Sequence, residues 1–315
     1  MEAAAAGSVP GAAPGARPGG APRPAARHAP AARVVVTGAG GMLGRAVVER
    51  FAVCHDVVPL RHADCDLTDA RATRDWLEGC APRHIVHCAA WTDVDGCESD
   101  PERALRANSF ATRNVALAAQ HVDASLCYIS TDYVFDGAKP GPYREEDPTA
   151  PLNVYGLSKR DGERHVLRHC RRSYVVRTSW LFGPGGKNFV RTMAELLRAR
   201  DEVRVVNDQV GSPTYTLDLA RCLLALVESE FYGIYHLTNA GTCSWYELAS
   251  AIAARLGSRC RVVPCASAEL PRPAPRPLNS VLEPWNYRAS GLPMPRSWRA
   301  AVDDYLGVLA REEDR

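Results

Sequence analysis

The sequence predicts an α/β fold in which a doubly wound parallel sheet carries a smaller C-terminal substrate lobe. Two observations lead to this fold class. From residue 33 onward, short apolar runs rich in β-branched residues alternate with longer amphipathic segments, and a glycine-rich turn joins the first run to the first amphipathic segment. Apolar strands separated by helices are typical of a parallel sheet covered on both faces, whose ligands bind at the carboxyl ends of the strands.

The positions of the elements follow from their periodicity. Strands are expected at residues 33–37, 56–60, 84–89, 125–130, 174–178, 203–206 and 234–237. Helices are expected around residues 42–52, 69–79, 101–121, 154–170, 188–199, 215–229, 244–256 and 297–310. After about residue 258 the chain is rich in proline and arginine, which favours loops before the last helix.

Three regions are expected along the chain. Residues 1–32 are mostly Ala, Gly, Pro and Arg. Such a segment buries too little apolar surface to offset its ordering entropy, so we expect a disordered tail that is no signal peptide; an alternative is that translation begins downstream of it. Residues 33–182 would form the main sheet domain. Residues 183–315 would form mainly the lobe, with strands near 203–206 and 234–237 returning to the main sheet.

Composition excludes several classes of partner. A net charge of +2 favours neither nucleic acid nor an anionic membrane, and no apolar run approaches the ~20 residues of a membrane span. The 11 cysteines are scattered and never spaced as CxxC, which favours a reducing cytoplasm. His165 and His169 lie four residues apart but lack a metalloprotease pattern, so they are interpreted as a solvated helix face. We expect no metal site.

The glycine-rich turn predicts a nucleotide cofactor. Gly38, Gly41 and Gly44 form a GxxGxxG between the first strand and the first helix. Gly38 allows a tight exit from the strand, Gly41 lets the backbone approach a pyrophosphate, and Gly44 lets helix and strand pack closely. The same three glycines outside this context would be weak evidence.

The end of the second strand indicates which cofactor binds. NAD sites usually place an acidic residue there, whereas NADP sites favour arginine. This chain has Arg61 after Leu60, which predicts NADPH. Asp64 lies close enough to leave NADH as an alternative, and Asp66 and Leu67 would contact the adenine. Residues 33–182 are therefore expected to be an NADP-binding domain.

A YxxxK pair predicts acid–base chemistry. Tyr155 and Lys159 are four residues apart on an expected helix and share one face. A neighbouring ammonium should lower the pKa of the phenol toward the working pH. Only three of the 38 basic residues are lysines, so a lysine here favours chemistry that arginine cannot supply. Thr131 ends the fourth strand, where a hydroxyl could polarise a substrate carbonyl.

Together these residues resemble the extended short-chain dehydrogenases, and within them the dTDP-4-dehydrorhamnose reductases. The resemblance covers residues 33–310, with one departure at Asp136, where the family often has proline. The most specific segments are STDYVFDG (130–137), PLNVYGLSK (151–159), RTSWLFGPGGKNF (177–189), VNDQVGSPT (206–214), YHLTNAG (235–241) and RPLNSVL (276–282).

The resemblance implies a role for each matching residue. Tyr155 would donate a proton, Lys159 would bind the nicotinamide ribose and tune the tyrosine, and Thr131 would assist. Asp132 and Trp180 would contact the substrate, Trp180 by stacking. The expected cofactor-binding residues are Gly38, Gly41, Met42, Leu43, Gly44, Arg61, Asp66, Leu67, Ala90, Trp91, Thr92, Tyr155 and Lys159.

The implied reaction is NADPH-dependent reduction of the C4 ketone of a dTDP-4-keto-6-deoxysugar, with dTDP-4-dehydro-L-rhamnose as the leading substrate. The alternatives are a related reductase of antibiotic biosynthesis, such as a dTDP-dihydrostreptose synthase, and a non-catalytic regulatory subunit of the same fold. A dehydratase would need an acidic residue where Tyr133 stands, which argues against that class. We expect a monomer or homodimer in the cytoplasm.

Overall fold

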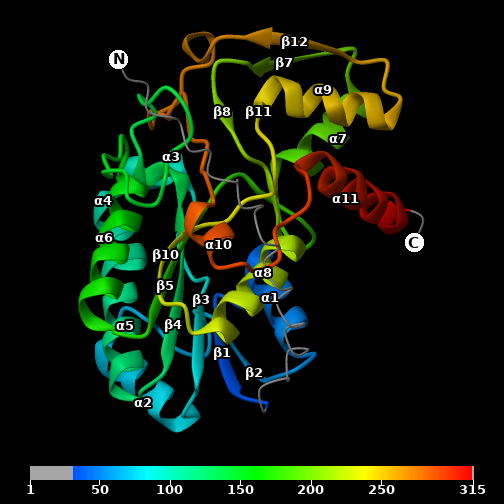
Figure 1. Ribbon diagram of the computed structural model, residues 1–315. Coiled ribbons are helices and arrows are strands. Elements are labelled where there is room, and N and C mark those ends of the chain that lie inside the picture. The colour runs from blue at the N-terminus through cyan, green and yellow to red at the C-terminus, as the bar shows by residue number, and fades with distance from the viewer. Residues whose placement is uncertain (1–30, 314–315) are drawn as a thin grey trace, which may run out of the picture. The chain divides into compact units, whose positions relative to one another are not determined.

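The computed structural model describes residues 31–313, which follow the predicted alternation of strands and helices (Figure 1). The strands are β1 Arg33–Thr37, β2 Asp56–Leu60, β3 His84–His87, β4 Ser125–Thr131, β5 Ser173–Thr178, β6 Leu181–Phe182, β7 Glu202–Val206, β8 Val210–Gly211, β9 Thr214–Tyr215, β10 Gly233–His236, β11 Cys243–Ser244 and β12 Arg261–Cys265. The helices are α1 Met42–Phe51, α2 Ala70–Cys80, α3 Val94–Ser99, α4 Pro101–Ala104, α5 Ala111–His121, α6 Val154–His169, α7 Phe189–Ala199, α8 Thr216–Ser229, α9 Trp245–Leu256, α10 Trp285–Ala289 and α11 Trp298–Glu313.

The main sheet has six strands in the order β10-β5-β4-β3-β1-β2, and all of its neighbouring pairs are parallel. Successive residues of β1 face opposite sides of this sheet, as a strand period of two requires. Val34 and Val36 pack into a core with α1 and α8, whereas Val35 packs into a second core with α2, α5 and α6. Figure 1 shows these two helical layers on either side of the sheet. The prediction of a doubly wound parallel sheet is confirmed.

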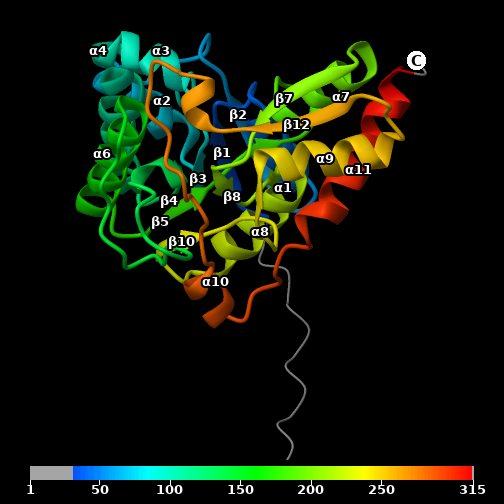
Figure 2. The same ribbon diagram turned by 90° about the horizontal axis from the view of Figure 1, so that it is seen from above.

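The lobe has its own core, built on α7, α9 and α11. Its strands form three two-stranded sheets: β7 pairs with β12 in parallel, β8 pairs with β11 antiparallel, and β6 pairs with β9 in parallel. Figure 2 shows β7 and β12 running side by side next to α9. The expectation that a strand near 203–206 returns to the main sheet is wrong, because this strand pairs with β12 instead. The strand expected near 234–237 does return, as β10 beside β5.

Other differences concern the regions with weak periodicity. Strand β12 lies inside the proline-rich stretch that was expected to be loops, and it is held by its ladder with β7. The helix expected over 101–121 is one continuous helical run, in which a π-helical turn at Leu105–Phe110 joins α4 to α5. The short helices α3 and α10 were not predicted. Such short elements owe their stability to tertiary contacts, which a periodicity search does not register.

The expected disordered tail lies almost wholly outside the described residues, which begin at Ala31. Ala32 is already tied to the fold, because its carbonyl accepts a hydrogen bond from the Asp56 N–H at 3.0 Å. From Ala31 onward the described chain packs as one unit, so the expected boundary between residues 182 and 183 does not separate two independently packed domains. Among the described helices, none is long and apolar enough to cross a membrane.

A close backbone approach between β1 and α1 explains two of the glycines. Gly38 has a φ of +64°, which places the end of β1 in the left-handed region. A Cβ added to the buried Gly44 would lie 2.1 Å from the Gly38 carbonyl oxygen, so the first turn of α1 can touch this carbonyl only without a side chain.

This contact predicts the effect of a single methyl group. Gly44→Ala should lower the free energy of unfolding by about 1–3 kcal/mol, because overpacking outweighs the better helix propensity of alanine. The exposed Gly40 has open space at the Cβ position, so Gly40→Ala should change stability by less than about 0.5 kcal/mol. Urea unfolding of both variants without ligands measures the difference. Equal stability of the two variants would contradict this interpretation.

Candidate active site

Two adjoining cavities lie along the carboxyl ends of the main-sheet strands. The lobe cavity, about 430 Å³, reaches from the glycine turn to Trp180 and Trp245. The edge cavity, about 630 Å³, reaches from the glycine turn toward Arg61 and α4. Gly38, Gly41, Cys88 and Ala90 line both cavities, so the two form one continuous groove.

The start of α1 is available to an anion at the middle of this groove. Gly41 precedes α1 and provides no side-chain cap for it. The first N–H groups of the helix, which have no intrahelical partner, therefore lack a side-chain partner as well, and they add to the positive end of the helix dipole. Met42, Leu43 and Gly44, in this first turn, line the lobe cavity. A glycine cradle at an uncapped helix start fits the pyrophosphate of a dinucleotide.

Basic and acidic groups line the edge cavity. Arg61, Asp66, Leu67 and Trp91 are all at its wall, as predicted. The Asp66 carboxylate accepts hydrogen bonds from the N–H and the hydroxyl of Thr68, at 2.9 and 2.8 Å, and these bonds lower its pKa.

Asp64, in contrast, turns back on its own loop. Its carboxylate accepts the Arg61 N–H at 2.7 Å, and it is not among the residues lining the groove. The side chain that could have favoured NADH as the cofactor therefore stabilises the turn that carries Arg61. Arg103 and Arg106, from α4 and the π-helical turn, add further positive charge to the cavity wall, and Arg103 lies 4.2 Å above the Trp91 ring.

Helix α6 presents Tyr155 and Lys159 to the lobe cavity. The Asn153 side chain caps this helix by accepting the Gly156 N–H at 2.8 Å. Gly156 also packs so closely on the Tyr133 carbonyl that an added Cβ would lie 2.1 Å from its oxygen. The cap and this contact fix the first turn of α6 beside the end of β4.

Lys159 is buried, with 2% of its surface exposed. Its ammonium donates to the Ile129 carbonyl at 2.7 Å and lies 4.2 Å above the ring of Tyr128. Burial lowers the pKa of Lys159 to about 7, and the nearby Glu163 carboxylate opposes that shift.

The pKa of Tyr155 differs in direction from the expectation. Burial raises this pKa, although a hydrogen bond with Thr131 partly opposes the rise. The expected lowering by Lys159 is wrong for this structure, because the ammonium is engaged by the Ile129 carbonyl and desolvation of the phenolate dominates. The phenol is therefore protonated at neutral pH, which is the form that a proton donor requires.

Thr131 and Asp132 follow β4 into the same cavity. The Thr131 hydroxyl donates to Asp132 Oδ1 at 2.9 Å, and it accepts the Tyr133 N–H at 3.2 Å. Asp132 is 3% exposed, and its Oδ2 is buried without a hydrogen-bond partner. The Thr178 hydroxyl at the end of β5 is likewise buried and unpartnered. Two unsatisfied polar atoms at one cavity wall fit a polar ligand that can bond to both.

Trp180 closes the lobe side of the cavity. Its ring stacks on Trp245 of α9, with ring centroids 3.5 Å apart and planes 8° from parallel. A Cβ on Gly211 would lie 2.5 Å from the Trp180 ring, so this indole is also packed against β8. Trp180 has a φ of +49°, an unfavourable conformation for a non-glycine residue. Trp245 was missed by sequence analysis because it is 65 positions away and in no motif.

The π-helical turn Leu105–Phe110 ties the two walls of the groove together. The side chain of the buried Asn108 accepts the Trp91 N–H at 2.8 Å and donates to the Trp91 carbonyl at 3.0 Å. The same amide donates to the hydroxyl of Ser158, which lies between Tyr155 and Lys159 on α6. The loop after β3 and the YxxxK helix therefore share one buried side chain.

This fold and this groove define an oxidoreductase of the short-chain dehydrogenase type, with a dinucleotide site along the glycine turn and a tyrosine–lysine pair facing a polar cavity. Residues 32–311 match the family model described as RmlD substrate binding domain. The chain belongs to this family.

The relatives agree with that assignment. The chain is 43% identical to the dTDP-4-dehydrorhamnose reductase of Streptomyces griseus over 296 residues, which cover 91% of this chain and 97% of that protein. It is 42% identical to the probable dTDP-4,6-dihydroxy-2-methyloxan-3-one 4-ketoreductase of Streptomyces antibioticus, over 89% of this chain and 97% of that one. The crystal structure of dTDP-4-dehydrorhamnose reductase from Bacillus anthracis in complex with NADP matches with a TM-score of 0.86 and 39% identity, over 88% of this chain and 99% of that one.

Every residue predicted for the site lines the groove, while the role of each stays a prediction. The residues at the lobe cavity are Gly38, Gly41, Met42, Leu43, Gly44, Ala90, Thr92, Thr131, Asp132, Tyr155, Lys159 and Trp180. The remaining four, at the edge cavity, are Arg61, Asp66, Leu67 and Trp91. The groove residues that sequence analysis missed include Arg103, Arg106, Tyr133, Lys187 and Trp245.

Burial of Asp132 predicts a pH-dependent stability. Burial raises the pKa of Asp132 to about 6, above the ordinary 3.8, so the folded state binds this proton more tightly than the unfolded chain. The resulting stabilisation is complete below about pH 4 and is lost as the pH rises through about 6. Asp132→Asn should therefore match the wild type at pH 4 and exceed its stability at pH 7, by up to about 3 kcal/mol.

Asp136 is the control, because its pKa is shifted in the opposite direction from that of Asp132. The Tyr143 hydroxyl donates to Asp136 and lowers its pKa, so Asp136→Asn should lose stability at pH 7. Urea unfolding at the two pH values measures both effects. If Asp132→Asn and the wild type differed equally at pH 4 and pH 7, the buried ionisation would not be the cause.

Proposed function

We propose that this chain reduces the C4 ketone of a dTDP-4-keto-6-deoxysugar with NADPH, converting dTDP-4-dehydro-L-rhamnose to dTDP-L-rhamnose. The observation that carries the proposal is the convergence of Tyr155, Thr131 and Lys159 on one cavity, which is continuous with an uncapped, glycine-lined helix start. The relatives named dTDP-4-dehydrorhamnose reductases support the substrate class, and the NADP complex of the Bacillus anthracis enzyme supports the cofactor.

The bound cofactor supplies the hydride, and the residues of the groove supply binding and proton transfer. The N–H groups of the first turn of α1 would hold the pyrophosphate, and Lys159 would hold the nicotinamide ribose. The Tyr155 Oη–H would donate its proton to the ketone oxygen as that oxygen gains charge. Thr131, hydrogen-bonded to this phenol, would orient it toward that oxygen.

The sugar part of the substrate fits the polar wall of the lobe cavity. Asp132 Oδ2 and the Thr178 hydroxyl are buried and lack partners, and hydroxyl groups of a hexose can satisfy both. The stacked pair of Trp180 and Trp245 offers an apolar surface to the sugar ring or the thymine base. Arg61, Arg103 and Arg106 line the opposite end of the groove, where the 2′-phosphate of NADPH would lie.

The nearest second candidate is reduction of a different dTDP-ketosugar. The Streptomyces antibioticus relative is named for such a substrate and is about as similar as the rhamnose-type reductases. Incubation with NADPH and each of the two ketosugars, followed by mass spectrometry of the products, tests both. Turnover of dTDP-4-dehydro-L-rhamnose at least as efficient as that of the other ketosugar supports the proposal. Turnover of neither would favour the non-catalytic subunit.

We also propose that the enzyme works in the cytoplasm as a monomer or homodimer. All 11 cysteines are free thiols in the structure, which supports a reducing compartment.

The assignment of Tyr155 can be tested by removing one hydroxyl. Tyr155→Phe keeps the ring and its packing, so it should lower kcat by at least about 10²-fold while cofactor binding, measured by fluorescence quenching, changes little. Tyr232→Phe removes the hydroxyl of a surface tyrosine away from the groove and should leave kcat unchanged. A Tyr155→Phe enzyme with more than about a tenth of the wild-type kcat would rule out Tyr155 as the proton donor.

Arg61 predicts the choice between cofactors. A hydrogen bond from a charged group to a phosphate is worth about 1.5–3 kcal/mol, so Arg61→Asp should reduce the preference for NADPH over NADH by about 10–100-fold. Arg164→Asp makes the same charge change on the exposed face of α6, outside the groove, and should leave the preference intact. The ratio of kcat/KM for the two cofactors is the measurement. A wild type that prefers NADH would show that Arg61 does not select the cofactor.

A further inference from the structure

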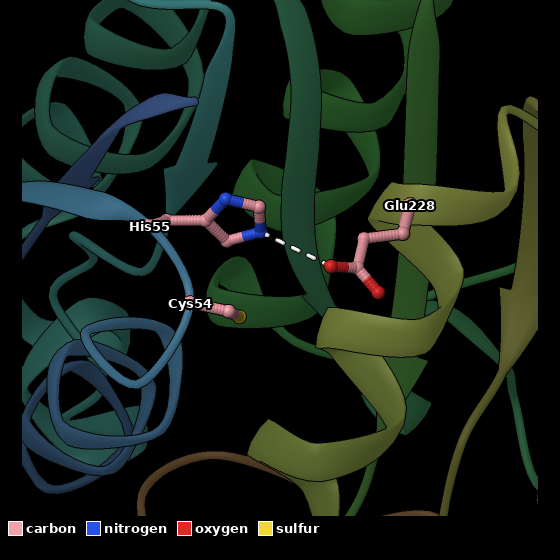
Figure 3. Close-up of side chains that lie close together, drawn as sticks. All are labelled: Cys54, His55 and Glu228. Carbon is pink, nitrogen blue, oxygen red and sulfur yellow. Dashed lines mark ion pairs between the residues drawn. The ribbon is translucent and has the colours of Figure 1, made fainter. Parts of the chain in front are cut away.

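A group of three potential metal ligands lies at the amino ends of the main-sheet strands, opposite the groove at their carboxyl ends. Cys54 and His55 lie between the end of α1 and the start of β2, and Glu228 lies in the last turn of α8. Their ligand atoms are all within 4.8 Å of one another. Figure 3 shows the His55 ring and the Cys54 side chain both directed toward the Glu228 carboxylate. It is the one cluster of this kind among residues 31–313.

His55 is the buried member of the group. Its side chain is only 1% exposed, and its Nε2 has no hydrogen-bond partner. This nitrogen nonetheless faces Glu228, with Nε2 and Oε1 3.3 Å apart (Figure 3). A buried polar atom without a partner is costly, and it therefore points to a ligand that would satisfy it.

The distance between His55 Nε2 and Glu228 Oε1 and the chemistry of the three donors fit zinc. Zinc binds histidine nitrogen at about 2.0–2.1 Å and carboxylate oxygen at about 2.0–2.2 Å, which in a tetrahedron places the two atoms about 3.3–3.5 Å apart. The observed separation is 3.3 Å. A sulfur, a nitrogen and an oxygen donor together suit zinc, whereas magnesium and calcium take oxygen ligands.

We propose that Cys54 Sγ, His55 Nε2 and Glu228 form a zinc site with a water molecule in the fourth position. The Glu228 side chain is 32% exposed and Cys54 is half-buried, so solvent reaches the open position. The ion would fasten the start of β2 to the end of α8, next to the core that α1 and α8 share. The strand β2 starts beside the zinc site and ends next to Arg61 in the groove. The zinc is therefore separated from the groove by the length of this strand and takes no part in catalysis.

Zinc binding would move two protons. The Ala32 N–H donates to His55 Nδ1 at 3.3 Å, so in the metal-free protein a neutral ring carries its proton on Nε2. Zinc replaces the Nε2 proton, which leaves for solvent, while Nδ1 takes up a proton from solvent and the long bond from the Ala32 N–H opens. The Cys54 thiol binds as a thiolate, so its proton leaves for solvent and one proton is released for each zinc bound.

A catalytic use of the same three residues is disfavoured. Burial raises the pKa of the Cys54 thiol, and the Glu228 carboxylate raises it further. A nucleophilic cysteine needs the opposite shift. The sequence carries no metal-ligand spacing for these residues, because Glu228 is more than 170 positions from the other two.

The experiment measures zinc retained by the tag-free full chain. After incubation with zinc sulfate and gel filtration, the wild type should carry about one zinc per chain, and zinc should raise its Tm. Cys54→Ser and Glu228→Gln should each weaken zinc binding by at least about 100-fold and lose the Tm shift. Removing a group that is only hydrogen-bonded to a metal ligand costs about 10–100-fold in affinity, and removing the ligand itself should cost more. Both changes are at partly exposed side chains, so the variants should fold.

Cys80→Ser is the matched control, because Cys80 is also half-buried, lies outside the cluster and should retain full zinc binding. Cobalt provides a second measurement: the wild type and Cys80→Ser should show a thiolate-to-cobalt charge-transfer band that Cys54→Ser lacks. The proposal is overturned if the wild type elutes without zinc, or if Cys54→Ser or Glu228→Gln binds zinc as tightly as Cys80→Ser. None of these results depends on the reductase activity.

Discussion

The buried ion pair between Glu163 and Arg177 is the interaction on which the geometry of the groove depends. Both side chains are 4% exposed, and the guanidinium donates to the two carboxylate oxygens at 2.9 and 2.8 Å. Ser130 of β4 donates to the same carboxylate, and Arg177 also reaches the Glu145 carbonyl. Removing one partner of such a pair leaves a buried charge and typically costs about 3–5 kcal/mol. Helix α6 is therefore held in one position over β4 and β5.

The consequence for the site follows from helix geometry. Glu163 is one turn after Lys159 and two turns after Tyr155, so fixing Glu163 also fixes the side chains that face the cavity. The Glu163 carboxylate also favours the charged form of Lys159, against the effect of burial. One ion pair thus contributes both to the position of the YxxxK residues and to the charge of its lysine. The Asn108 amide also supports this helix, by donating a hydrogen bond to the Ser158 hydroxyl.

The sequence predicted those parts of the site that depend on local patterns. The glycine turn, Arg61 after β2 and the tyrosine–lysine spacing each have a physical meaning within a few residues, and the structure places all of them at one groove. Trp245, Arg103 and Arg106 reach the groove from elements whose own sequences carry no ligand-binding pattern. The direction of the Tyr155 pKa was wrong because it depends on burial and on the Ile129 carbonyl, which takes the ammonium. The pairing of β7 with β12 joins segments more than 50 residues apart, and its register is set by the lobe core.

The return of β10 to the main sheet has a consequence for how the polypeptide can be divided. After β5 the chain enters the lobe, comes back through α8 and β10, leaves again through α9 and β12, and comes back once more at α10 before α11 closes the lobe. Neither half is therefore a continuous stretch of polypeptide. A truncation after β5 would expose the edge of that strand and remove α8 from the face of α1. A protease that cuts the connection after β5 would leave two fragments that still share the main-sheet core, and moving the whole lobe to another protein would take more than one cut.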